Sequence, residues 1–516
     1  MYSYQFVVRI VMKICFFLQR RFAYVGHTLM CNLNKEFGVR DFCAYVMLRA
    51  NHTFLRSQKD ITYGTLLLDE DIHNSFRAET LDPSYLAWLE KEYGIPNLWP
   101  YLMVDRILIS TQLVREYPYD KPMLSHTDML RVLQATAKKI ISFLETEKPD
   151  GVVFGVVSSL GSMLLYEIAK KKGIKTLVID FTKIGGGVLL TENYKEFTGV
   201  KKIFKATMSG KRAPQKLGEA EEFLKKFRVE RFSYNEEFAP AASSVNRETQ
   251  FAFLKVKKLL PSLFWHLKHS TEYLRKKERD YDDIQPHFMM WDKCKRKLRV
   301  LRGYDDLYAA PEQGEPFALY PLHLDPEIAT LLLGPHHTDQ IHVIKQMARS
   351  LPVGHKLYVK EHPSMVGYRT RRYYKEITKI PNVKLINPNV SGIELVKTAQ
   401  LVFTISGTVG WEAVLTGKPV ITFGDVGYNI LSFIRHSDSY EKLPYLVKEQ
   451  LEQFTYDEQE LLHFLNALLE DSVTLNLHDA WLNGRPIEEL KKDVGLQSLA
   501  ELIAKKLSLK PLPKQS

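Results

Sequence analysis

Cysteine is scarce in this sequence, and the short motifs of several large enzyme classes are missing. The 516 residues include four cysteines, which form no CxxC pair and show no metal-ligand spacing with histidine. We therefore expect neither a disulfide framework nor a zinc site, and a reducing cytoplasm is the simplest compartment. There is no GxxxxGK[ST] phosphate loop, and the glycines at 185–187 lack the GxGxxG spacing of a nicotinamide-binding turn. These absences argue against P-loop and nicotinamide enzymes.

Long hydrophobic runs are missing as well. The apolar stretch at residues 6–18 is interrupted by Arg9 and Lys13. It is too short to span a bilayer, and no small-residue cleavage site follows it. We therefore expect neither a signal peptide nor a transmembrane helix there. Residues 1–11 are interpreted as an extension before a first buried strand, with an amphipathic membrane-surface segment as the alternative.

Basic residues outnumber acidic ones, 71 to 60, and the formal net charge is +11. This balance suits a phosphate-rich ligand or an anionic membrane surface. Nucleic acid would fit the charge too, but the sequence contains no zinc-finger or RNP motif. We therefore expect an anionic ligand and no nucleic-acid partner.

Strand-like and helical stretches alternate in two parts of the chain. In the first part, the pattern predicts a helix at 27–37 that ends at Gly38, and strand, helix and strand at 151–157, 158–172 and 175–179. This alternation indicates a parallel sheet covered on both faces, in a domain at 12–190. Residues 191–310 lack strand signals and predict a basic, mainly helical segment. A second α/β domain is expected at 316–455, and helices with a basic tail are expected at 456–516.

The most informative stretch of the second domain is a strand that opens onto a helix. Residues 401–405 are a short β-rich run, Ser406, Gly407 and Thr408 form a polar turn, and helical spacing resumes at 409–415. A helix amino terminus presents unpaired backbone N–H groups and the positive end of the helix dipole, so the turn predicts a phosphate site. Glu412 lies one turn further on, where its carboxylate could bind a ribose hydroxyl. The alternative is that Glu412 only complements the helix dipole.

A second polar motif ends the strand expected at 356–360. Side chains alternate along a strand, so Lys360 and His362 should share one face while Glu361 points away. We interpret Lys360, His362 and Pro363 as further nucleotide-sugar contacts, because parallel sheets bind ligands at the carboxyl ends of their strands. The alternative for His362 is a histidine held in the turn before Pro363.

These motifs together resemble a known family. The segments KLYVKEHP, FALYPLHLDPE and TISGTVGWEAVLTGKPVITFG are similar to those of bacterial capsule and surface-polysaccharide biosynthesis glycosyltransferases related to Kdo transferases. The resemblance implies a GT-B-like α/β fold, in which two Rossmann-like domains face a cleft, here with a helical insertion. It implies a nucleotide-sugar donor, with CMP-linked sugars among the options, a polysaccharide or lipid-linked saccharide acceptor, and no cofactor. It also implies a location in the cytoplasm or at the inner face of the membrane. Asp325 stands where the related segment more often has Gln.

Catalysis by such an enzyme needs a stabilised leaving phosphate and a base or nucleophile for the acceptor hydroxyl. The helix terminus with Lys360 and His362 could stabilise the phosphate without a metal site. By position, His27 and Asp180 are the candidate groups from the first domain, with structural capping as the alternative for both. In the second domain, Glu327 and Asp339 are expected to line the cleft.

One alternative mechanism and two alternative functions have to be considered as well. The acidic runs at 69–71 and 280–282 contain Asp-x-Asp patterns of the kind found in metal-dependent transferases, but neither adjoins the phosphate turn, and we interpret both as surface acids. A sugar-nucleotide epimerase would share the architecture without needing an acceptor. A non-catalytic polysaccharide-assembly protein would bind the ligands without turnover.

Overall fold

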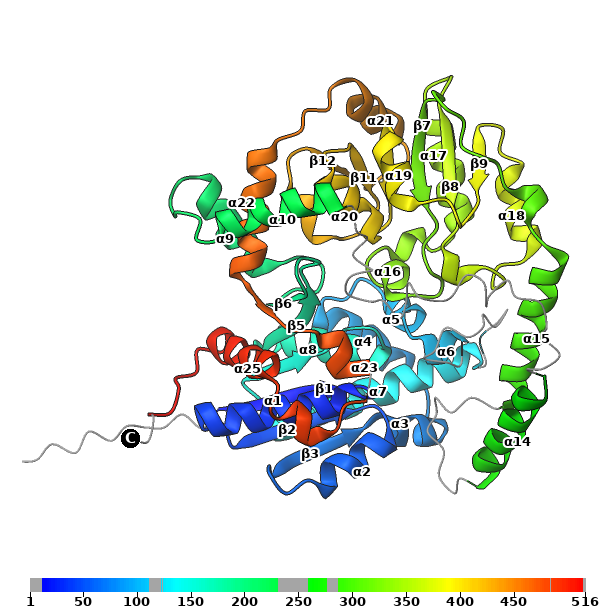
Figure 1. Cartoon of the computed structure of the whole chain (residues 1–516). Helices are drawn as coiled ribbons and strands as arrows, with labels where there is room; N and C mark the ends of the chain where they lie inside the picture. The colour runs from blue at the N-terminus through cyan, green and yellow to red at the C-terminus, as the bar shows by residue number, and fades with distance from the viewer. Residues whose placement is uncertain are drawn as a thin grey trace, which may run out of the picture. The chain divides into compact units, whose positions relative to one another are not determined.

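The computed structural model describes residues 12–110, 122, 124–230, 259–275, 286–482 and 484–513. The described residues form two compact units, one from those within 12–102, 124–199 and 471–513, the other from those within 103–122 and 200–470. Each unit is built around its own β-sheet (Figure 1). The prediction of two Rossmann-like α/β domains is therefore confirmed. Residues 1–11 and the acidic run at 280–282 lie outside the described residues.

The first unit contains a seven-stranded sheet in the order β13-β6-β5-β4-β1-β2-β3. The strands are β1 (Lys13–Leu18), β2 (Asp41–Val46), β3 (Tyr63–Leu68), β4 (Gly151–Phe154), β5 (Lys175–Phe181), β6 (Gly187–Thr191) and β13 (Ser472–Thr474). Strands β1 to β5 are parallel, and β6 pairs antiparallel with β5 and with β13. The five residues from Ile14 to Leu18 are all fully buried. This is the pattern of a central strand whose two faces are both covered.

Helices of the first unit pack on this sheet or on one another. They are α1 (Phe22–Phe37), α2 (Arg49–Ser57), α3 (Asp69–Ser75), α4 (Pro83–Tyr93), α7 (His126–Glu147), α8 (Leu160–Lys171), α23 (Leu477–Leu482), α24 (Ile487–Leu490) and α25 (Val494–Lys506). The short helix α5 (Trp99–Met103) ends this part of the chain. The predicted helix end at Gly38 is confirmed, since Gly38 has a left-handed φ of 69°.

The start of α1 differs from the prediction. The helix begins at Phe22, not at residue 27, and a turn in which Phe22 donates its backbone N–H to Gln19 O at 2.9 Å leads into it. Phe22, Val25, Leu29 and Leu33 recur at helical spacing and are all buried. The loop after β1 is therefore short.

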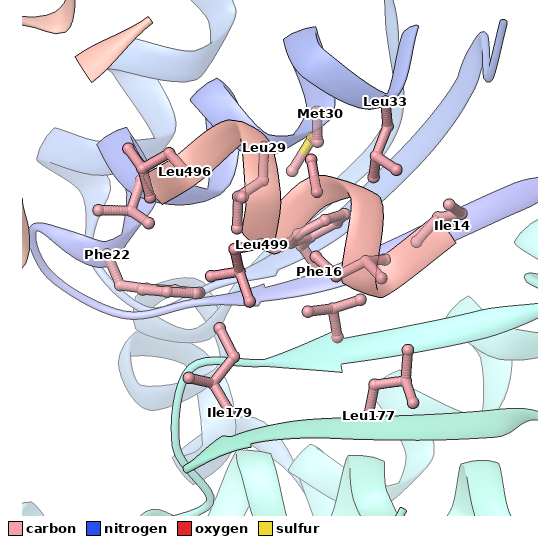
Figure 2. Close-up of a cluster of buried hydrophobic side chains, with 14 of the residues drawn as sticks. Ile14, Phe16, Phe22, Leu29, Met30, Leu33, Leu177, Ile179, Leu496 and Leu499 are labelled. Atoms are coloured by element: carbon pink, nitrogen blue, oxygen red, sulfur yellow. The ribbon is translucent and has the colours of Figure 1, made fainter. Parts of the chain in front are cut away.

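The end of the chain returns to the first unit. β13 pairs with β6, and α25 packs on α1. Leu496 and Leu499 of α25 belong to the same buried cluster as Phe22, Leu29 and Met30 (Figure 2). The expectation of only helices and a tail at 456–516 is wrong, because this segment contains β13. Strand β12 (Ile434–His436) lies before it, within the range expected for the second α/β domain.

The second unit contains a six-stranded sheet in the order β12-β11-β10-β7-β8-β9, parallel throughout. Besides β12, its strands are β7 (Phe317–Pro321), β8 (Lys356–Lys360), β9 (Val383–Ile386), β10 (Leu401–Thr404) and β11 (Val420–Thr422). β7 pairs in register with β8 from Phe317↔Lys356 to Pro321↔Lys360. The chain passes from β7 through β8 to β9 and then returns to β10 on the other side of β7. This return creates a topological switch point between β7 and β10, where such sheets bind their ligands.

Helices of the second unit include two groups. Those between its strands are α16 (Ile328–Leu331), α17 (Gln340–Ser350), α18 (Arg371–Thr378), α19 (Gly392–Thr398) and α20 (Thr408–Leu415), followed by α21 (Leu443–Glu452) and α22 (Glu458–Glu470). Those that come before β7 in the chain are α6 (Arg106–Ser110), α9 (Thr198–Met208), α10 (Leu217–Glu230), α14 (Leu259–Arg275) and α15 (Pro286–Arg302). Among the described residues, no helix combines the length and hydropathy needed to cross a membrane.

Candidate nucleotide-binding site

Three polar turns lie together at the carboxyl edge of the second sheet. The turns follow β7, β8 and β10, which are adjacent in the order β10-β7-β8. His323, His362 and Ser406 each stand two residues beyond the end of one of these strands. Neighbouring strands are about 4.8 Å apart, so this arrangement spans roughly 10 Å, which is the scale of a nucleotide phosphate and ribose. The predicted convergence of the Ser406 turn and the His362 turn at one sheet edge is therefore present, with β7 between them.

The turn between β10 and α20 is held tightly. Gly407 donates its backbone N–H to Thr404 Oγ1 at 2.9 Å and serves as the N-cap of α20. A Cβ at residue 407 would lie 3.1 Å from both His323 Nε2 and Thr404 Oγ1. A side chain at residue 407 would therefore crowd these two atoms, whereas the φ of −74° would itself admit any residue. No side chain caps the helix at residue 407, so its first backbone N–H groups face the edge of the sheet.

The electrostatics of α20 favour an anion at this end. Arg228 Nε donates to Leu415 O at 3.2 Å, which places a cation at the carboxyl end of the helix. At the amino end of α20, no capping side chain bonds to the backbone, and the first turn contains no acidic residue. Helix α8 of the first unit differs, because Ser159 accepts the N–H of Ser162 at 3.3 Å in a capping box. The amino end of α20 is therefore suited to an external acceptor, as a phosphate oxygen would provide.

His323 is a further candidate residue that the sequence motifs did not single out. Its side chain is buried, and Nε2 accepts the backbone N–H of Ser406 at 3.2 Å. Gln340 fixes its backbone, accepting from His323 N at 2.8 Å and donating to His323 O at 3.1 Å. Because Nε2 is an acceptor, a neutral ring carries its proton on Nδ1. In the sequence, His323 could have been recognised by its position in PLHLDPE, just after the residues that form β7.

In the motif after β8, His362 is partly exposed, whereas Lys360 and Glu361 are buried and bonded to other parts of the second unit. His362 is half-buried, and its Nδ1 accepts the N–H of Ser364 at 3.2 Å at the start of the short 3-10 helix Pro363–Met365. Lys360 Nζ donates to Pro388 O at 3.1 Å, so its side chain extends toward the end of β9. Glu361 is fully buried and accepts from Arg369 Nη1 at 2.6 Å and from Tyr374 Oη at 2.7 Å. The predicted opposite orientation of Glu361 thus corresponds to a buried ion pair beneath the turn.

The remaining residues of the predicted phosphate turn are more enclosed than expected. Ser406 Oγ donates to Ala329 O at 2.6 Å, which ties the turn to α16. Thr408 is half-buried at the first position of α20. Glu412 lies one turn further on and is only 4% exposed. A ligand at this turn would therefore meet mainly the backbone N–H groups and the Thr408 hydroxyl.

His27, a candidate base, lies inside α1 and not at a loop. Its Nδ1 is 2.6 Å from the hydroxyl of Tyr63, the first residue of β3, so it lies toward the amino edge of the first sheet. Burial lowers its pKa from the ordinary value of 6.5. Its Nε2 is 3.5 Å from Cys31 Sγ and 3.5 Å from Asp60 Oδ2. These contacts favour a structural role for His27.

The same three side chains form a possible ligand set for a metal ion. Donor atoms of His27, Cys31 and Asp60 all lie within 4.8 Å of one another. Lys491 Nζ, however, already pairs with Asp60 at 2.9 Å, and burial raises the pKa of the Cys31 thiol to about 11. A lysine ammonium thus already supplies positive charge beside Asp60. The cluster belongs to the first unit, whereas the three polar turns belong to the second.

Two other candidate groups do lie at carboxyl edges. Asp180 is the last but one residue of β5, is half-buried, and accepts the backbone N–H of Phe181 at 2.7 Å. Burial raises the pKa of the Asp180 carboxyl above its ordinary value. Glu327 stands at the N-cap of α16, after β7. Asp339 caps α17 by accepting the N–H of His342 at 3.1 Å, so it has a local structural role.

The interpretation of the acids at 69–71 as surface residues is wrong for two of them. Asp69 and Glu70 are buried at the carboxyl end of β3, and only Asp71 is exposed. Tyr45 donates its hydroxyl to Asp69, and Glu70 accepts the backbone N–H of Arg49 at 2.6 Å. The first turn of α3 packs these carboxylates inward. Their position directly after a strand is the sequence signal that favours this burial.

A pocket elsewhere in the second unit does not coincide with these turns. Its volume is about 370 Å³, and its lining includes Arg349, Glu376 and Asn382. Arg349 lies in the last turn of α17, and Asn382 directly precedes β9. The pocket therefore lies at the amino ends of the strands, where a parallel sheet does not bind nucleotides.

His337, at the carboxyl edge of the second unit, predicts a pH-dependent stability. Burial and the neighbouring His336, His436 and His342 lower the pKa of His337 from 6.5 to about 4. Between these values the unfolded chain takes up a proton that the folded chain does not, so stability falls as the pH decreases. From pH 7 to pH 5 the loss should be about 1 kcal/mol, because the ring is half-buried and solvent screens part of the effect.

Urea unfolding of wild type and His337→Gln at both pH values measures this contribution, which the variant should lack. An identical pH dependence in both proteins would contradict the prediction.

Comparison with known proteins identifies part of this chain. Residues 302–457 match the family described as "Capsule polysaccharide biosynthesis protein". Protein FixF of Sinorhizobium fredii is 39% identical over 89 residues, which is 16% of this chain and 20% of FixF. The capsule polysaccharide modification protein LipA of Neisseria meningitidis serogroup A is 29% identical over 68 residues, which is 13% of this chain and 10% of LipA. The matches thus cover a fifth or less of these curated relatives.

Solved structures with a similar arrangement include a domain of KpsC from Thermosulfurimonas dismutans, described as a beta Kdo 2,4 transferase. It shares 14% sequence identity over 67% of this chain and 88% of the KpsC chain, with a TM-score of 0.35. The family match at 302–457 contains β7 to β12 and all three polar turns. Over these residues, which are less than half of the chain, the protein is similar to capsule polysaccharide biosynthesis proteins.

Proposed function

We propose that this protein is a glycosyltransferase that moves a sugar from a nucleotide-sugar donor to a growing surface polysaccharide or glycolipid. The observation that carries the proposal is the amino end of α20 at the β7/β10 switch point. It has no side-chain cap, and Gly407 is pressed against His323 and Thr404. Such a turn suits a diphosphate or phosphodiester. The match of this domain to capsule polysaccharide biosynthesis proteins supports the sugar chemistry.

The proposed donor contacts follow from the positions of the turns. The backbone N–H of Thr408, at the start of α20, binds the phosphate, since the Gly407 N–H is already donated to Thr404 Oγ1. Glu412, one turn further on, is proposed for the ribose and would have to become accessible when the donor binds, because it is buried. His362 supplies a further donor from the turn after β8. Charge that develops on the leaving phosphate is stabilised by the fixed dipole of α20, so the transfer is proposed to be metal-independent. Lys360 and Ser406 support these turns through Pro388 and Ala329.

The acceptor side is proposed to involve the first unit, in the GT-B manner. Asp180 is the stronger candidate base there, since it ends a strand and its pKa is raised by burial. Glu327 is proposed as a cleft residue of the second unit. The nucleotide sugar could be CMP-linked, and the acceptor is a polysaccharide or a lipid-linked saccharide. We propose that the reaction takes place on the cytoplasmic side of the membrane.

Calorimetric and thermal-shift titration with CMP, UDP, GDP, dTDP and CMP-Kdo, with and without magnesium, tests the donor site. Stabilisation by one nucleotide class, unchanged by magnesium, would support the proposal and identify the donor. Stabilisation that requires magnesium would refute the metal-independent mechanism. If none of these nucleotides binds, the protein does not have the proposed donor site, and a non-catalytic assembly role becomes the better explanation.

Two substitutions test the site at residue level. Thr408→Val and His362→Ala should each weaken binding of the identified nucleotide about tenfold, because each removes one hydrogen bond to a charged group. Matched controls occupy the opposite ends of the same elements. Thr416 lies at the carboxyl end of α20, and His355 directly precedes β8. Thr416→Val and His355→Ala should leave the affinity unchanged. Equal affinities in all four folded variants would place the nucleotide elsewhere.

Turnover distinguishes transfer from epimerisation. A glycosyltransferase consumes the nucleotide sugar only when an acceptor saccharide is present, apart from slow hydrolysis. Conversion of the free nucleotide sugar into an epimer without any acceptor would instead identify an epimerase.

A further inference from the structure

An apolar stripe runs along the exposed side of α15 in the second unit. Met290, Trp291, Leu298 and Leu301 are between 43% and 62% exposed, and Cys294 is also exposed. At about 100° per residue, these positions fall within roughly 100° of the helix circumference. They therefore form one continuous strip and are not scattered surface residues. Water-exposed Trp and Leu side chains in such a strip indicate a surface that is covered when the protein works.

The opposite side of α15 fastens the helix to the domain. Arg299 Nη1 donates to the backbone oxygens of Gly367 and Tyr368 at 3.2 and 2.5 Å. Asp292 is buried and pairs with Arg296 at 2.7 Å, and the Arg296 guanidinium lies 4.4 Å from the centre of the Tyr368 ring. These contacts fix the rotation of the helix about its axis. The apolar stripe is thus held facing outward.

Cations border the stripe on both sides. Lys297 lies beside Met290 and Leu301 on one border, and Lys295 and Arg302 follow Trp291 on the other. Over the whole helix, the sequence has six cations against one acid, Asp292, which is already paired. The six are Lys293, Lys295, Arg296, Lys297, Arg299 and Arg302. The border is therefore complementary to a negatively charged surface.

The neighbouring helix α14 extends the same feature. It contacts α15, and its Phe264, Leu267 and Leu274 are exposed at helical spacings of three and seven residues. Lys268 and Arg275 lie on the same side of α14 as these residues. Both helices thus combine exposed aromatic or aliphatic side chains with flanking cations.

We propose that α15, with α14, lies in the interface of an anionic phospholipid membrane, with the apolar stripe among the acyl chains and the flanking cations at the lipid phosphates. An amphipathic helix with Trp and Leu on one side and Lys and Arg at its borders binds in this way. A protein partner would satisfy the apolar stripe, but cations along both borders favour a surface that is negative on all sides. The inference stands apart from the nucleotide site, since no residue of the three polar turns takes part.

Vesicle sedimentation with the full chain tests this proposal. We expect binding to vesicles of phosphatidylcholine mixed with phosphatidylglycerol, and at least about tenfold weaker binding to phosphatidylcholine alone. The double variant Trp291→Glu, Leu298→Glu should lose about tenfold or more in affinity for the mixed vesicles. Val353→Glu is the matched control, because Val353 is a fully exposed apolar residue of the same unit outside α14 and α15. It should bind as the wild type does.

A second readout reports on the stripe itself. Brominated phospholipids should quench part of the tryptophan fluorescence, and Trp291→Phe should remove most of this quenching while retaining vesicle binding.

Three results would overturn the proposal: no binding of wild type to mixed vesicles, equal binding to both vesicle types, or full binding by the double variant. A concentration-dependent dimer that the double variant abolishes, without any vesicle binding, would assign the stripe to a second copy of the chain. Nucleotide titration of the same variants should give wild-type affinities, so failure of one proposal does not imply failure of the other.

Discussion

Replacing Arg369 by alanine should lower the free energy of unfolding of the second unit by about 3–5 kcal/mol. Arg369 is buried, and Nη1 donates to Glu361 Oε1 at 2.6 Å while Nη2 donates to His323 O at 2.6 Å. The alanine variant leaves the carboxylate of Glu361 buried without its counter-charge, and it leaves a buried carbonyl without this donor. The loss should be large because a buried charge deprived of its partner keeps the full cost of its desolvation.

Urea unfolding measures this effect, and Arg371→Ala provides its control. Arg371 also pairs with an acid, Asp306, but that acid is exposed on the surface. The control should lose much less stability, because solvent screens an exposed ion pair. A loss in Arg369→Ala no larger than that of the control would contradict the prediction. The double variant Arg369→Met, Glu361→Gln should recover part of the loss, because it removes both buried charges together.

Replacing Leu499 by alanine should destabilise the first unit by about 2–5 kcal/mol. Leu499 is fully buried in α25 and lies in the cluster that includes Phe22, Leu29 and Phe16 of the sheet and α1 (Figure 2). Truncation removes three buried carbon atoms from a closely packed interior and leaves a cavity. The predicted loss of stability is large because α25 packs into the core of the first unit, although it lies near the end of the sequence.

Val494→Ala is the control for this substitution. Val494 lies on the same helix and is 72% exposed, so its truncation should change stability by no more than about 0.5 kcal/mol. Hydrogen exchange locates the effect. In Leu499→Ala, amides of β1 and β2 should lose protection, while those of β7 and β10 should keep it. Loss of protection in β7 and β10 instead, or equal effects of the two substitutions, would show that α25 does not stabilise the first unit.

The sequence was most informative where a signal is local. Gly38 and the periodic apolar residues before it place the end of α1, and the strand, helix and strand expected within 151–179 correspond to β4, α8 and β5. The turn at Ser406, Gly407 and Thr408 could also be predicted, because a β-rich run followed by small polar residues and helical spacing has few other solutions. Each of these features depends on residues within about one or two helical turns of one another.

The sequence was less informative where a side chain's role depends on distant partners. Glu361 lies next to the predicted binding residues, yet its carboxylate is held by Arg369 and Tyr374, eight and thirteen residues further on. His323 becomes a site residue only because β7 lies beside β10, which brings Ser406 within 3.2 Å. His27 fits a loop histidine by its position, whereas the apolar face that starts at Phe22 draws it into α1. Asp69 and Glu70 fit surface acids by composition, but Tyr45 and Arg49 bind them inside.

The sequence by itself thus determined the class of both sheets, the strand-to-helix turn at residues 401–415 and the basic character of residues 191–310. These follow from hydrophobic periodicity, turn chemistry and charge, which are properties of short segments. Only the tertiary structure decided that the described residues from 471 onward complete the first unit, and which carboxylates are buried. It also decided that the apolar stripe of α15 faces outward, because Arg299 bonds to the carbonyls of Gly367 and Tyr368. Those outcomes depend on pairings between residues far apart in the chain, which no local pattern encodes.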